Sequence, residues 1–290
     1  SERVRQLRGN NDADGTPLSD EAVLAAADFG LFVDLASMCQ SDKDNRRTEG
    51  EDGLFRHSLG SLDVVYAHKG LMSLLSTRVP EGVEVDRSYE DRGWTNFERA
   101  EGQLIKPDTF CVDIGLFSEK AARDRRAVRI GEVPFAKKSV KELARQGSGS
   151  RGLLRQLVGS NRDAPLSPDA FATVLSKKEF TNGADSATVI NLYRDTATAL
   201  LGSTRDLCYH ELEWSDAEYE RLGEALCYCG ALETLEVKEM ELSDTAAAAV
   251  VAGLASCTSL KTLNLHGCSS LTALPDLSAL TSLQTLDLGR

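Results

Sequence analysis

Apolar and polar positions recur at a fixed spacing in the last third of the chain. Leu207 and Leu235 stand 28 residues apart, and so do Trp214 and Leu242, each followed by Ser-Asp. A unit of this length cannot bury its own apolar face, so neighbouring units must stack on one another. Further units restart, after steps of 28 and then 23 residues, at Leu232, Leu260 and Leu283. The pattern therefore predicts a stack of similar units from about residue 204 onward.

Each unit is predicted to place a short strand before a helix. The two clearest strands cover 260–265 and 283–288, where leucines alternate with polar residues. Helices are predicted over about 216–229 and 244–257. The unit between these strands contains Pro275, which disfavours a long helix there.

The sequence of 204–290 resembles leucine-rich repeats, of the ribonuclease-inhibitor type in the 28-residue units and of the plant-receptor type in the 23-residue unit. This resemblance implies an α/β solenoid whose concave strand face binds a protein partner. The alternative is that so short an array only caps the half before it. Its last strand would expose Leu283, Leu286 and Leu288, so we expect a truncated array and a natural chain that continues.

Strand-like and helix-like patterns alternate in the first half of the chain. Buried strands are predicted at 31–35, 71–75 and near 127–130, and helices at 19–28, 54–68 and 94–105. This order is typical of a parallel sheet with helical crossovers. We therefore predict a loose segment 1–18 and an α/β domain over 19–203. The helices that begin at 167 and 186 would form its C-terminal extension.

Charge and cysteine content narrow the classes of function. A net charge of −12 argues against nonspecific binding to nucleic acid or to an anionic membrane surface. No apolar run is long enough to cross a membrane, and no signal peptide opens the chain. The seven cysteines are odd in number and lack the spacing of a zinc site. These features predict a cytoplasmic protein without a metal centre.

Polar residues follow the first predicted strand at Asp34, Ser37 and Gln40. In parallel α/β sheets, ligands bind beyond the C-terminal ends of the strands. These three side chains are therefore predicted to line a ligand site, together with the loop after residue 75. Such a site could also bind a small molecule without turnover.

The predicted helix 94–105 carries two carboxylates close to its apolar stripe. Glu101 falls inside the stripe, and Glu98 lies at its edge beside Trp94. Desolvation raises the pKa of a carboxyl group, and a raised pKa suits a general acid or base. The alternative is that both side chains reach solvent or pair with Arg92 and Arg99.

Residues 89–105 resemble the helix of Toll/interleukin-1 receptor (TIR) domains that carries a Trp, three residues and then a Glu. The stretches 34–40, 65–68 and 92–94 also resemble fungal heterokaryon-incompatibility (HET) domains. The resemblance covers about 28–110 and implies a three-layer, flavodoxin-like or TIR-like fold. In active TIR domains this Glu is the catalytic residue of NAD cleavage, which assigns that role to Glu98. Asp34, Ser37, Gln40 and Trp94 would then line the nucleotide site.

These resemblances imply an intracellular signalling or immune-type protein that couples a TIR-like domain to a repeat domain. The first domain would self-associate and could cleave NAD as a substrate, with no cofactor required. The carboxylate would stabilise a ribosyl cation as nicotinamide leaves. The alternative is a protein-interaction scaffold without chemistry. TIR domains begin with a strand and a loop that hold the nucleotide, and residues 1–18 show no such strand.

Overall fold

The computed structural model describes residues 39, 42, 44, 46–79, 82–106, 110–116, 162–181, 183 and 185–289. They belong to two compact units, the first formed by 1–59 with 119–154 and the second by 60–118 with 155–290. The second unit thus contains residues from both predicted domains. The predicted loose segment 1–18, the predicted helix 19–28 and the strands predicted at 31–35 and 127–130 lie outside the described residues. Among those described, no helix combines the length and apolarity needed to cross a membrane.

The helix predicted over 54–68 is two helices. In the first unit, α4 spans Glu49–Leu59 and buries none of its residues. Its start is capped by Thr48, whose hydroxyl accepts the N–H of Glu51 at 3.3 Å while the Glu51 carboxylate accepts the Thr48 N–H at 2.8 Å. In the second unit, α5 spans Leu62–Ala67. Gly60 lies between the helices, and glycine has a low helix propensity, which explains why the single-helix prediction was wrong.

A parallel strand pair confirms the predicted α/β class. Strand β1 spans Ser73–Leu75 and pairs with β2, Cys111–Asp113, in the register Leu74 to Val112. Helix α6, Gly93–Gln103, connects them and agrees with the helix predicted at 94–105. The sequence did not predict β2, since its three residues are too short to form a pattern. The short 3₁₀ helix η2, Ile114–Leu116, follows it.

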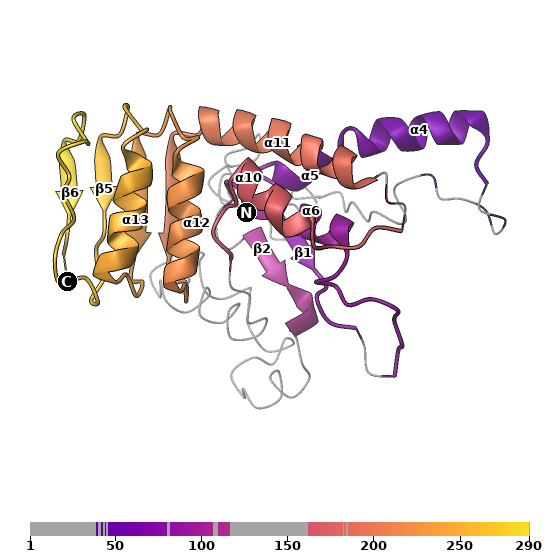
Figure 1. The fold of residues 1–290 in the computed structure, drawn as a ribbon, viewed down its shortest axis with the longest axis horizontal. Coiled ribbons are helices and arrows are strands. Elements are labelled where there is room, and N and C mark those ends of the chain that lie inside the picture. The colour runs from indigo at the N-terminus through magenta and orange to yellow at the C-terminus, as the bar shows by residue number, and fades with distance from the viewer. Residues whose placement is uncertain are drawn as a thin grey trace, which may run out of the picture. The chain divides into compact units, whose positions relative to one another are not determined.

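Two further helices pack on α6 (Figure 1). Helix α10 spans Pro168–Leu175, and the Ser167 hydroxyl caps it by accepting the Ala170 N–H at 3.1 Å. Helix α11 spans Asp185–Ser203. The ring of Tyr193 on α11 stacks on Phe171 of α10 with centroids 3.8 Å apart, and Phe171 lies 6.4 Å from Phe97 of α6. These buried rings form the core of this half.

The last third of the chain forms a four-stranded parallel sheet in the order β3-β4-β5-β6 (Figure 1). Its elements are β3 Asp206–His210, α12 Asp216–Leu226, β4 Thr234–Lys238, α13 Asp244–Leu254, β5 Thr262–Asn264 and β6 Thr285–Asp287. The residues that pair are those of the sequence repeat, Leu207 with Leu235, Leu235 with Leu263, and Leu263 with Leu286. The described segment between β5 and β6 contains no helix, in agreement with the prediction made from the position of Pro275.

The helices α12 and α13 approach each other closely at two glycines. A Cβ atom on Gly253 would lie 2.1 Å from the carbonyl oxygen of Gly223, and one on Gly223 would lie 2.5 Å from the carbonyl oxygen of Ala249. Both distances are far below van der Waals contact. Only glycine therefore permits this helix spacing.

The repeat sheet is joined to the α/β half through buried polar contacts within the second unit. The Arg162 guanidinium donates to the carbonyl oxygens of Gln103 and Leu104 at the end of α6. It also lies over the ring of Tyr209 on β3, 4.6 Å from the centroid. The indole N–H of Trp214 donates to the Arg162 carbonyl at 2.6 Å. A cation at the negative end of a helix is favourable, so Arg162 stabilises this junction.

Candidate functional site

The start of α6 is fixed by a loop that follows α10. The Gly93 N–H donates to the Glu179 carbonyl at 2.9 Å, and the Glu179 N–H donates to the Asp91 carbonyl at 2.8 Å. A Cβ atom on Gly93 would lie 2.0 Å from the ring of Phe180. The glycine before Trp94 leaves room for the Phe180 ring, which accounts for this part of the motif without reference to a ligand.

Trp94, predicted to line a nucleotide site, is held by protein groups. Its indole N–H donates to Asp185 at the start of α11, at 3.2 Å. Its ring meets Phe97 edge to face, with centroids 5.8 Å apart. The side chain is half-buried. These contacts fix the orientation of the indole and leave part of its surface exposed.

Glu98, predicted as the catalytic carboxylate, lies one helical turn after Trp94 and is half-buried. Its charge acts on Tyr89, whose pKa is raised first by burial and then by Glu98. The next residue, Arg99, instead pairs with Glu90 at 2.8 Å and with Asp163 at 2.7 Å. Of the predicted site, the structure thus places Trp94 and Glu98 together on α6. Asp34, Ser37 and Gln40 lie outside the described residues.

Glu101 is a buried carboxyl group on the same helix. The residue has an exposed fraction of 0%, and neither carboxylate oxygen has a hydrogen-bond partner. Burial, followed by repulsion from Asp63, raises its pKa to about 9. The Thr196 hydroxyl lies near enough to oppose this rise, but it donates to Asp63 at 3.2 Å rather than to Glu101. Glu101 is therefore protonated at neutral pH.

A buried lysine completes this polar cluster. Lys106 follows α6 with an exposed fraction of 1%, and its ammonium donates to the Ser73 hydroxyl at 2.7 Å. Burial lowers its pKa to about 8, against the opposite effects of Cys111 and Glu101. The sequence analysis identified Glu101 from its place in the apolar stripe but missed Lys106 and Asp63, which carry no such signal. Because Glu101 and Lys106 are almost fully buried, they interact with other core residues and not with solvent.

At the described rim of the β1–β2 sheet, the side chain at the end of β2 hydrogen-bonds to neighbouring protein groups. Asp113, at the end of β2, accepts the Thr77 hydroxyl at 2.6 Å and the Gly115 N–H at 2.9 Å. A Cβ atom on Gly115 would lie 2.6 Å from the backbone nitrogen of Arg78. The loop after residue 75 was predicted to present ligand groups. Its first part contacts the sheet through Thr77, and Arg87 further along pairs with Glu179 at 2.9 Å.

The four-stranded sheet presents polar side chains in rows that run across the strands. The rows contain Asp206, Thr234, Thr262 and Thr285; Cys208, Glu236, Asn264 and Asp287; and His210 with Lys238. The alternate residues of β3, β4 and β5, such as Leu235 and Val237, are buried, whereas Leu286 of β6 is exposed. None of the row residues is buried. This face is a candidate binding surface.

Ion pairs organise the charges on this face. Glu233 pairs with Arg205 at 3.2 Å and with Lys261 at 2.6 Å, and Glu236 pairs with Lys238 at 2.6 Å. A hollow of about 430 Å³ lies near the starts of the strands and is lined by Glu233, Ser259, Lys261, Thr281, Ser282, Leu283 and Gln284. Its lining is mostly polar, which suits the side chains of a protein partner.

Comparisons with protein-family models, with curated proteins and with solved structures found no match to this chain.

Proposed function

We propose that this protein is a protein-interaction scaffold in which the polar face of the sheet β3-β4-β5-β6 binds a protein partner. The observation that carries the proposal is the in-register arrangement of uncovered polar rows over a leucine-filled core. Short stacked units create an extended surface of this kind, and binding is their usual role. The resemblance of 204–290 to leucine-rich repeats supports the same conclusion.

The α/β half would have a structural role and would support the sheet that carries this polar face. Buried hydrogen bonds join Arg162 to the end of α6 and to Trp214, which follows β3, and the Arg162 guanidinium lies over the ring of Tyr209 on β3. In the described part of the α/β half, Trp94 and Asp113 bond to protein groups. This use of polar side chains favours a structural role for this half.

The proposal predicts that a partner contacts the strand face and not the helix face. A photo-crosslinking residue placed at Asn264 should capture a protein, whereas one at Glu224, exposed on α12, should not. Glu236→Lys should weaken binding of the captured protein about tenfold, because it replaces the Glu236–Lys238 ion pair on this face with two like charges. Glu224→Lys is the matched control. Equal capture from both faces, or binding indifferent to Glu236→Lys, would contradict the proposal.

A second candidate function, NAD cleavage by the α/β half, is supported by one observation. Glu98 and Trp94 lie one turn apart on α6, and both are only half-buried, unlike Glu101. We expect Glu98→Gln to reduce nicotinamide release from NAD by a hundredfold or more if Glu98 acts in the reaction, because it would remove the charge that stabilises the ribosyl cation.

The assay would use the whole purified chain, both dilute and clustered on a support, with Glu224→Gln as the matched helical control. No release in either state, or equal release by Glu98→Gln, would eliminate this candidate and leave the scaffold proposal intact.

A further inference from the structure

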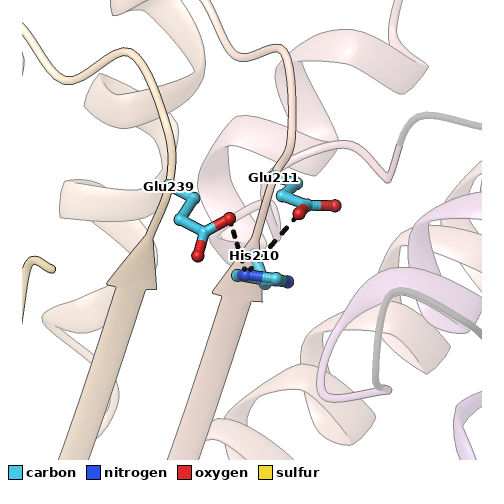
Figure 2. A group of neighbouring side chains, drawn as sticks. All are labelled: His210, Glu211 and Glu239. Atoms are coloured by element: carbon cyan, nitrogen blue, oxygen red, sulfur yellow. Dashed lines mark ion pairs between the residues drawn. The ribbon is translucent and has the colours of Figure 1, made fainter. Parts of the chain in front are cut away.

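Three potential metal ligands converge where β3 and β4 end (Figure 2). His210 is the last residue of β3, and Glu211 and Glu239 are the first residues after β3 and β4. The His210 Nε2 atom lies 3.4 Å from a carboxylate oxygen of Glu239 and 4.0 Å from one of Glu211. All three ligand atoms lie within 4.8 Å of one another.

Both glutamates occupy the same position in the turn that follows each strand. Glu211 and Glu239 each have a φ of 52°, a left-handed conformation that residues with side chains rarely adopt. The equivalent residue of the next unit is Gly267, with a φ of 74°. A Cβ atom on Gly267 would lie 2.8 Å from the Cγ atom of Glu239, so the glycine makes room for the Glu239 side chain.

We propose that His210, Glu211 and Glu239 bind one divalent transition-metal ion through the imidazole Nε2 atom and one oxygen of each carboxylate. An ion held at about 2.0–2.2 Å by tetrahedral ligands needs ligand atoms about 3.3–3.6 Å apart. The observed separations require only small side-chain movements to meet this geometry. Imidazole with carboxylates suits zinc, iron or cobalt better than calcium.

The surroundings of the site allow an ion to enter. The side chains of His210, Glu211 and Glu239 are 20%, 30% and 51% exposed. The nearest strand neighbour of His210 is Lys238, whose ammonium donates to Glu236 at 2.6 Å. Three protein ligands leave at least one coordination position for water or for another ligand. The cysteine spacing could not reveal this site, because its ligands are a histidine and two glutamates. They come from two units that lie 28 residues apart in the sequence.

The test is a titration of the whole purified chain with Co²⁺, followed by visible absorption. We expect one saturable equivalent, with an affinity that falls about tenfold or more in His210→Gln and in Glu239→Gln. The matched control is His266→Gln, which changes the equivalent position of the unit that contains β5, two residues after that strand, and should leave the affinity unchanged.

A second measurement covers the case in which a variant fails to fold. In the unmodified protein, bound Co²⁺ should shift or broaden the imidazole NMR signals of His210 more than those of His266. Absence of saturable binding, equal affinity in all variants, or a thiolate-to-cobalt band that Cys208→Ser removes would overturn the proposal.

Discussion

Glu101→Gln is expected to raise the free energy of unfolding by on the order of 3 kcal/mol at pH 8 and to change it little at pH 4. The reason is the buried carboxyl group on α6, whose pKa rises from an ordinary value of 4.5 to about 9. Gln has nearly the shape of the protonated acid and does not ionise. In the unmodified protein, folding at higher pH carries the free-energy cost of protonating Glu101. The variant does not have this cost.

The direction of the pH dependence follows from proton binding. Between pH 4.5 and 9 the folded protein keeps the Glu101 proton, whereas the unfolded chain releases it. The contribution of Glu101 to the free energy of unfolding is therefore fully present below pH 4.5 and is lost as the pH rises through this window. Lys106 acts in a later window, since its pKa is lowered from 10.5 to about 8 and stability rises with pH between these values.

Urea denaturation at pH 4, 6 and 8 measures the effect, with Trp94 and Trp214 as fluorescent reporters. The difference between Glu101→Gln and the unmodified protein should grow with pH, and the comparison at pH 4 is the internal control. Asp63→Asn should reduce the pH dependence without abolishing it, because burial is the larger cause of the shift. A difference that stays constant with pH would show that Glu101 is ionised in the folded protein.

Gly253→Ala is expected to lower the free energy of unfolding by about 2 kcal/mol or more. The added Cβ atom would lie 2.1 Å from the Gly223 carbonyl oxygen of α12, so the two helices must separate. Alanine favours a helix over glycine by about 1 kcal/mol, which offsets only part of this cost.

The matched control is Gly202→Ala, near the end of α11. There a Cβ atom would meet the Tyr228 carbonyl oxygen outside the helix at 3.7 Å, an ordinary contact. This variant should gain up to about 1 kcal/mol from helix propensity. Thermal and urea unfolding of both variants measure the contrast. The packing argument fails if Gly253→Ala is as stable as Gly202→Ala.

The repeat spacing predicted most of the fold of the last third of the chain, because the periodicity of the sequence fixes the register of the strands directly. Leu207, Leu235 and Leu263 pair where the 28-residue step places them. Capping signals were equally local, so Ser167 and Pro168 predicted the start of α10. The assignment to leucine-rich repeats stays a prediction, as does the TIR-like or HET-like assignment.

Features that depend on contacts between distant segments were missed. Strand β2 is too short to show a pattern, and its pairing with β1 defines it. Glu101 could be identified from its position in the apolar stripe, but Asp63 could not be identified as its neighbour, since Asp63 approaches it only in the folded chain. The cluster of His210 and Glu239 is invisible along the sequence for the same reason.

The close approach of α12 and α13 has a consequence for the shape of the opposite, strand-lined face. Packed helices usually lie about 8–10 Å apart, whereas neighbouring strands lie about 4.8 Å apart, so this difference in width bends the sheet. Gly223 and Gly253 narrow the wider layer, and the missing helix between β5 and β6 narrows it further. Glycines that no partner touches would thus set the curvature of the surface that a partner meets.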